Sequence, residues 1–159
     1  AADAPALRDL GPFTEVSVVR ENARMVEKIS HAVVYVADQD RAKAFYTEKL
    51  GMEVRVDASY AGFRWLTVGP PSQPDVAYVL MAIAPGPMLD DESAKALRSL
   101  VERGVLGGGV LVAEDVRKTY EELSARGVEF LSPPVERPDG VEAVFRDDSG
   151  NYFSLGEKR

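Results

Sequence analysis

The sequence predicts an α+β fold made of two βαβββ modules. The first observation is a strand–helix–strand pattern over residues 29–54 that recurs over residues 110–130. The second is that further strand-like segments follow each copy, so that each module consists of a strand, a helix and three strands. Because a supersecondary unit that recurs along a chain forms the same structure each time, the two halves are expected to be structural equivalents.

Four residues align the two copies. A shift of 77 positions places Asp38 on Asp115, and each aspartate precedes a helical pattern that it can cap. Beyond the helix the shift is 76 and places Gly51 on Gly127, where each helix is expected to end. The two copies therefore share a start signal and a stop signal for their helices.

The first copy has clear element boundaries. Residues 29–37 are rich in valine and contain neither glycine nor proline, which is typical of a strand. A helix is expected over 41–50, capped from residues 38–40, because apolar residues there fall at helical spacing. A second strand is expected from residue 52 to residue 56.

Two further strands complete the first module. Residues 63–68 are aromatic and β-branched, and residues 76–84 are an almost continuous apolar run, typical of a strand covered on both faces. Between them, residues 69–75 contain three prolines and are expected to form a loop. The first module therefore ends near residue 84.

A connecting helix and the second module follow. Asp90 or Asp91 can cap a helix over 92–103, which has one apolar face. The second module is predicted to have strands near 110–113, 128–131, 141–145 and 151–155, with a helix near 116–126. Residues 132–140 are rich in proline and are predicted to be a loop, and residues 147–151 have the composition of a tight turn.

Composition limits the possible functions. The chain has 159 residues, a net charge of −7 and no run of basic residues, which argues against nucleic-acid binding. It has no cysteine, so disulfides and thiolate chemistry are excluded. No apolar stretch approaches the roughly 18 residues of a membrane span, and no signal peptide is visible. A cytoplasmic protein is expected.

Two motifs point to a family. Residues 145–155, FRDDSGNYFSL, resemble the F-x-D-P-x-G-N-x-x-x-L ending of the vicinal oxygen chelate (VOC) superfamily. Residues 44–54, AFYTEKLGMEV, resemble its A-x-x-F-Y-x-x-x-L-G-F segment. This superfamily contains glyoxalase I, extradiol dioxygenases, fosfomycin resistance enzymes and bleomycin-binding resistance proteins. The resemblance implies two modules whose curled, mixed sheets surround one shared cleft, with the helices on the outside.

The resemblance also implies a domain organisation. The VOC domain is expected over 27–157, with module one at 29–84, the connecting helix at 90–104 and module two at 107–157. Residues 1–26 lie outside the repeat and are expected to form an arm, as either a strand over 14–20 or a helical turn over 20–28. Family members commonly dimerise, so a homodimer is expected.

The family usually binds a divalent metal through four equivalent positions. When the family's four ligand positions are transferred to this sequence one at a time, they fall on His31, Val79, Gly108 and Ser154. The chain contains no other histidine. Iron, manganese, nickel or zinc sites of this kind need several His or carboxylate ligands. One imidazole is not enough, so the cleft is expected to lack a metal cofactor.

Several residues are candidates for binding a small organic molecule in the cleft. His31 could act as an acid or base. Ser154, Tyr78 or Tyr152 could donate hydrogen bonds, and the aromatic residues Trp65, Tyr78 and Tyr152 could line the cleft. The alternative is that the aromatic residues are core residues and that His31 is structural. Gly108, within the glycine run 107–109, leaves room either for a ligand or for close backbone approach. A displaced metal site formed by Glu142, Asp147 and Glu157 with His31 is a further alternative.

Three functions remain open at this point. The first is a metal-free protein that binds a small molecule, as the bleomycin resistance proteins do. The second is a metal-independent isomerase or lyase that uses His31. The third is a metal-dependent lyase, dioxygenase or isomerase with an unusual ligand set.

Overall fold

The computed structural model describes residues 25–157. The predicted arm over 1–26 therefore lies almost entirely outside the described residues. Residues 26–30 lead without helix or strand into the first strand.

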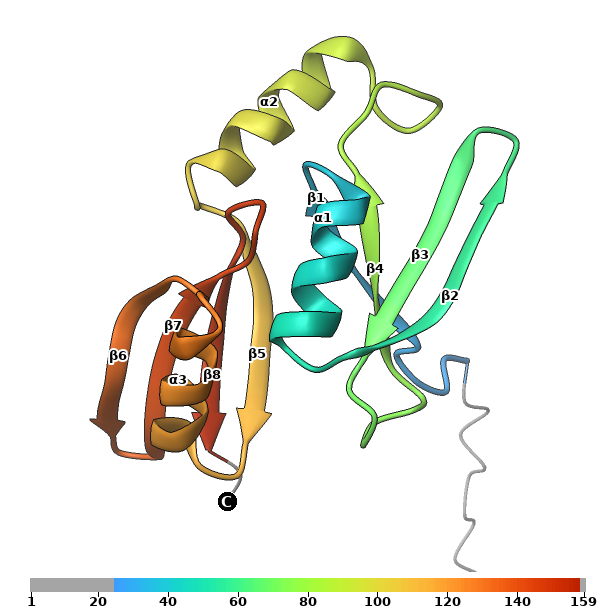
Figure 1. The fold of residues 1–159 in the computed structure, drawn as a ribbon. Helices are drawn as coiled ribbons and strands as arrows, with labels where there is room; N and C mark the ends of the chain where they lie inside the picture. Colours follow the sequence, from blue (N-terminus) through green and yellow to red (C-terminus); the bar gives the residue numbers. More distant parts are fainter. Residues whose placement is uncertain (1–24, 158–159) are drawn as a thin grey trace, which may run out of the picture.

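Module one has the predicted order of elements (Figure 1). Its sheet has the strand order β1-β4-β3-β2, in which β1 and β4 are parallel and the other pairs are antiparallel. The elements are β1 (His31–Val36), α1 (Gln39–Ala44), the π-helical turn η1 (Phe45–Lys49), β2 (Glu53–Tyr60), β3 (Phe63–Gly69) and β4 (Ala77–Ala82). The connecting helix α2 (Asp91–Glu102) follows, and Asp90 caps it by accepting a hydrogen bond from the Ser93 N–H.

Module two repeats this topology, which confirms the predicted repeat. Its strand order β5-β8-β7-β6 is that of module one, again with one parallel pair, β5 and β8. The elements are β5 (Gly107–Ala113), α3 (Val116–Ala125), β6 (Phe130–Arg137), β7 (Gly140–Arg146) and β8 (Tyr152–Glu157). No strand of one sheet pairs with a strand of the other in the part of the chain described, so the two sheets do not close into a barrel.

The predicted start and stop signals are confirmed. Asp38 and Asp115 each accept a hydrogen bond from the backbone N–H three residues later, at 2.9 Å. Gly51 and Gly127 have positive φ angles of 72° and 79°, a conformation in which a residue with a Cβ atom is strained. Equivalent residues therefore begin and end the helical segments of both modules.

The prediction of a loop over residues 132–140 was wrong. Strand β6 continues to Arg137 and includes Pro133 and Pro134. The prolines are tolerated because β6 is the edge strand of its sheet, where a missing N–H need not break a ladder. The pairing with β7 also shifts register on both sides of Ser132, as expected of bulges that accommodate unpaired residues.

The hydrophobic core joins both modules, and this corrects the expected position of α1. Tyr46 is fully buried and packs edge-to-face on Phe153 of β8, with ring centroids 6.2 Å apart. Buried residues of both sheets and of α1, η1 and α3 belong to this one core. Helix α1 and the η1 turn that continues it therefore lie between the two sheets rather than on the outside (Figure 1), because the two large aromatic residues of η1, Phe45 and Tyr46, need burial.

Candidate functional site

One face of the module-one sheet is turned away from the core. Strand alternation places Val34 and Val36 in the core and His31 and Val33 on the opposite face, where Val33 is 52% exposed. We call this opposite face the open face of module one. Besides His31 and Val33 it carries Tyr35, Val56, Tyr60, Phe63, Trp65 and Met81, which the strand pairing places on the same side.

An aromatic cluster lies on this open face. The rings of His31 and Trp65 are 5.6 Å apart between centroids and meet edge-to-face, and Phe63 lies 6.4 Å from Trp65. The Nδ1 atom of His31 is 3.0 Å from the Ser30 hydroxyl oxygen. The structure thus brings together two of the predicted site residues, His31 and Trp65. The Trp65 and Phe63 rings offer an apolar surface beside the His31 imidazole, whose ring nitrogens can form hydrogen bonds.

A pocket of about 410 Å³ lies at the other end of the same face. It is formed where the β2–β3 turn approaches the segment that follows β4. Its lining residues are Tyr35, Gln39, Ala61, Gly62, Phe63, Arg64, Met81, Ala82, Ala84, Pro85, Gly86, Pro87, Met88 and Leu89. This volume falls in the range of small-molecule sites, and most of the lining residues are apolar.

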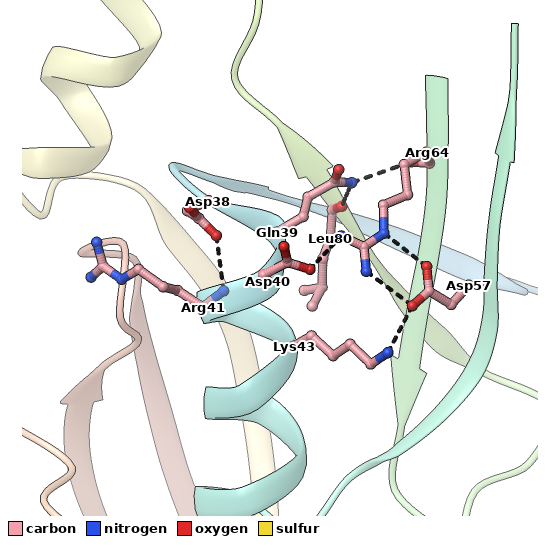
Figure 2. Close-up of polar contacts among 8 residues, drawn as sticks. All are labelled: Asp38, Gln39, Asp40, Arg41, Lys43, Asp57, Arg64 and Leu80. Carbon is pink, nitrogen blue, oxygen red and sulfur yellow. Dashed lines mark hydrogen bonds and ion pairs between the residues drawn. The ribbon is translucent and has the colours of Figure 1, made fainter. Parts of the chain in front are cut away.

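An ion-pair network holds one wall of this pocket in place (Figure 2). The guanidinium group of Arg64 donates two hydrogen bonds to Asp57, at 2.7 and 2.9 Å, and one to Asp40 at 2.7 Å. Lys43 of α1 donates to Asp57 as well, at 2.8 Å. Hydrogen bonds from Arg64 and Lys43 hold the pKa of Asp57 well below its usual value. The network ties the β2–β3 hairpin to α1.

Gln39 belongs to the pocket lining and is fixed by the backbone around it (Figure 2). Its Nε2 atom donates to the carbonyl oxygen of Leu80 at 2.8 Å and to that of Arg64 at 3.2 Å. Neither Gln39 nor the pocket is among the features predicted from the sequence. The sequence signal for the pocket is the Pro85-Gly86-Pro87 break, which predicts a turn directly after an apolar strand.

Tyr78 and Gly108 lie on the core side, where the two modules meet. The Tyr78 ring is half-buried and packs edge-to-face on Phe153 at 5.9 Å, and burial raises its pKa. A Cβ atom added to Gly108 would lie 2.0 Å from the Phe153 ring. Gly108 therefore allows the close approach of an aromatic ring, and the structure does not bring Tyr78 or Gly108 to the His31–Trp65 cluster.

Tyr152 and Ser154 lie on the corresponding open face of module two. Phe153 and Leu155, which alternate with them along β8, are buried in the core. The strand pairing places Ser154 beside Val110, and Val110 and Val112 are 69% and 64% exposed. We call the surface carrying Tyr152, Ser154, Val110 and Val112 the open face of module two. It belongs to a different sheet from His31 and Trp65.

Asp147 has a structural role in the turn before β8. Its Oδ1 atom accepts hydrogen bonds from the backbone N–H groups of residues 149, 150 and 151, at 2.8–3.0 Å. Its Oδ2 atom accepts from Tyr46 and from the Asn151 side chain. With both oxygens occupied, this carboxylate is not available to form a metal site with His31.

The neighbouring Asp148 is in a different environment. Both of its carboxylate oxygens are buried without a hydrogen-bond partner. Burial, followed by repulsion from Asp147, raises the pKa of Asp148 to about 6. The nearby Arg41 acts in the opposite direction.

The residues at the family's metal positions do not fit a metal ion. His31 offers one imidazole, Ser154 offers a neutral hydroxyl, and Val79 and Gly108 offer no ligand atom in their side chains. Across residues 25–157, no group of three or more His, Cys, Asp or Glu side chains is placed to hold a metal. These four positions therefore do not form a metal site of the family's kind.

The fold and this site define a class of protein: a paired βαβββ domain with an aromatic, largely apolar open face. Comparison with known families identifies the class. The chain belongs to the Glyoxalase/Bleomycin resistance protein/Dioxygenase superfamily, whose family model matches residues 28–155. The resemblance found in the sequence is thereby confirmed.

Relatives support this assignment along most of the chain. The crystal structure of UcmS2 is 54% identical, has a TM-score of 0.80, and the match covers 83% of this chain and 98% of that one. TnmS3, an antibiotic binding protein from Streptomyces sp. CB03234, is 29% identical with a TM-score of 0.67, covering 85% and 98%. The uncharacterized protein YetH of Bacillus subtilis is 32% identical over 134 residues, which are 84% of this chain and all of YetH.

None of the helices in residues 25–157 is long and apolar enough to cross a membrane.

Proposed function

We propose that this protein binds a small, largely apolar organic molecule without a metal and thereby sequesters it. The observation that carries the proposal is the His31–Trp65–Phe63 cluster, which lies on the same face as a pocket of about 410 Å³. Aromatic rings on a sheet can stack on a flat ligand, and His31 can orient it through a hydrogen bond.

The relatives support the same proposal. TnmS3 is described as an antibiotic binding protein, and the superfamily includes the bleomycin resistance proteins. A protein that acts by sequestration needs a complementary surface but no reactive group. The lack of fitting ligands at the metal positions agrees with such a role.

We also propose that the protein is a homodimer. Val110 and Val112 are 69% and 64% exposed, both on the open face of module two, which does not carry the His31–Trp65–Phe63 cluster. A second copy that covers this apolar face would remove it from water, and burial of apolar surface is the main driving force of association. Superfamily members often dimerise, which supports this assembly.

The binding function can be tested with a panel of polycyclic aromatic antibiotics. Trp65 is the only tryptophan, so quenching of its fluorescence reports binding at the open face of module one. Trp65→Ala should weaken binding by about tenfold, as expected for a lost stacking interaction of roughly 1.4 kcal/mol, and Trp65→Phe should lose less. Calorimetry measures these variants, which lack the fluorophore.

The metal-free part of the proposal has its own test. Elemental analysis of protein purified without chelator should give far less than one metal ion per chain. Stoichiometric iron, manganese, nickel or zinc that disappears in the His31→Gln variant would contradict the proposal and indicate a metal enzyme.

A further inference from the structure

Resting on the proposed function, we propose that Gln39 selects the ligand. Its Oε1 atom serves as a hydrogen-bond acceptor in the pocket at the β2–β3 turn, and it recognises an uncharged ring system that carries a hydroxyl or N–H donor.

The orientation of the Gln39 amide follows from its partners. Both atoms that it contacts, the carbonyl oxygens of Leu80 and Arg64, are acceptors. Only the NH₂ end of an amide can donate to them, so the Nε2 atom must face the backbone and the Oε1 atom must face away. Figure 2 shows the Oε1 atom turned away from both carbonyl groups.

The Oε1 atom is left as an unused acceptor. The structure records no hydrogen bond to it from any residue in the range 25–157, although Gln39 is only partly exposed. An acceptor covered without a partner loses its bond to water, at a cost of roughly 1–3 kcal/mol. A ligand that fills the pocket must therefore supply a donor or leave this acceptor unsatisfied.

The charged groups near the pocket are already neutralised by one another. Arg64 lines the pocket, but its guanidinium group is paired with Asp57 and Asp40. Hydrogen bonds to these two carboxylates raise the pKa of Arg64 above its usual value. Arg64 is therefore not available to bind an anionic ligand. The Gln39 amide, held by two backbone carbonyl groups, then offers a fixed neutral acceptor, which favours an uncharged donor.

The rest of the lining suits rings. Phe63 provides an aromatic face, and Met81 and Met88 provide two thioethers, which are polarisable and adapt to irregular apolar shapes. The Pro85-Gly86-Pro87 segment adds a wall that has few rotatable side-chain bonds. A ring system with one donor at its edge matches this combination of surfaces.

Two probes that differ in one donor test the proposal. The probe 2-naphthol carries a hydroxyl group, and 2-methoxynaphthalene has the same rings without the donor. In protein labelled at the methionine methyl groups, 2-naphthol should shift the NMR signals of Met81 and Met88 and leave that of the distant, buried Met52 unchanged. The methoxy compound should bind at least fivefold more weakly.

Two variants remove the acceptor in different ways. Gln39→Lys keeps a donor for the two carbonyl groups but has no acceptor, and Gln39→Met removes both functions. Each should lose the preference for 2-naphthol, whereas Gln73→Met, in the 70–76 loop, should keep it. Thermal unfolding of each variant shows whether it is folded.

Three results would overturn the proposal: no shift at Met81 or Met88, equal affinity of the two probes, or an unchanged preference in a folded Gln39 variant. If the antibiotic panel still quenches Trp65 in that case, the proposed function stands and only the role of Gln39 is refuted. Absence of quenching with every antibiotic would refute the proposed function instead.

Discussion

The hydroxyl group of Tyr46 donates a 2.8 Å hydrogen bond to Oδ2 of Asp147, and both residues are buried. Tyr46 belongs to η1 of module one and Asp147 to the turn before β8 of module two. The turn makes three more hydrogen bonds with module one: the Ala37 N–H donates to the Ser149 hydroxyl, the Asn151 side chain donates to the Tyr35 carbonyl, and the Arg41 guanidinium donates to the Asp148 carbonyl. These bonds fix the two modules relative to each other.

Replacing Tyr46 with phenylalanine should lower the free energy of unfolding by about 1.5–3 kcal/mol, the range for a hydrogen bond to a charged group. The ring stays in the core, so the loss reports the hydroxyl bond to Asp147. Urea unfolding followed by circular dichroism measures it. Tyr60→Phe is the matched control, because Tyr60 is 85% exposed. Equal stability of the two variants would show that the bond does not contribute.

Gly108→Ala should destabilise the fold by about 1–3 kcal/mol, the usual cost of overpacking a core. The new methyl group would lie 2.0 Å from the Phe153 ring, which would have to move against Tyr46 and Tyr78. Gly156→Ala, in β8 of the same sheet, is the control, because no atom lies within 4 Å of a Cβ added there. Denaturant unfolding of the two variants compares them, and a stable Gly108→Ala protein would contradict the packing argument.

The raised pKa of Asp148, about 6, predicts a pH dependence of stability. Between about pH 4, where an aspartate of the unfolded chain loses its proton, and about pH 6, the folded state binds more protons than the unfolded state. The contribution of Asp148 to the free energy of unfolding should therefore fall as the pH rises through this window and stay level above it.

Asp148→Asn isolates this contribution from the other titrating groups. The free energy of unfolding of the variant minus that of the parent protein should be larger at pH 8 than at pH 4.5, by on the order of 1 kcal/mol. This value includes a reduction for screening by solvent and for the attraction of Arg41. Urea titrations at the two pH values measure the difference. Asp38 and Asp147, which raise the pKa, and Arg41, which lowers it, remain in both proteins. An equal difference at both pH values would contradict the assignment.

Multi-angle light scattering should give twice the 17.3 kDa mass of the chain. Val110→Lys and Val112→Lys place a charge on the open face of module two, where the side chains are exposed in the single chain, so they should yield folded monomers. Leu100→Lys, on α2 outside the open faces, should remain dimeric. A monomeric parent protein at working concentration would refute the dimer.

The sequence by itself determined the repeat and most of its elements. Asp38 and Asp115 at the helix starts, and Gly51 and Gly127 at their ends, act within a few residues of their own position. Local signals of this kind can be recognised without the fold. The resemblance to the family added the expectation that each module forms a curled, mixed sheet. The sequence also limits the possible metal ligands, because the chain contains only one histidine and no cysteine.

The tertiary structure decided which residues share a surface. Tyr78 and Val79 are neighbours in β4, yet the strand pairing directs Tyr78 to Phe153 and Val79 to the open face. A difference of one residue in a strand reverses the face, and the sequence pattern of an entirely apolar strand does not record it. For the same reason His31 meets Trp65, while Tyr152 and Ser154 lie on another sheet.

The prolines of β6 and the pocket at Gln39 depended on long-range position. Pro133 and Pro134 are compatible with a strand only because β6 is at a sheet edge, and edge position is a property of the whole sheet. Gln39 reaches Arg64 and Leu80 across 25 and 41 residues of sequence. Contacts between distant segments form when the core of both modules packs. The Pro85-Gly86-Pro87 break indicates a turn after β4, but no local pattern indicates that Gln39 lines the same pocket.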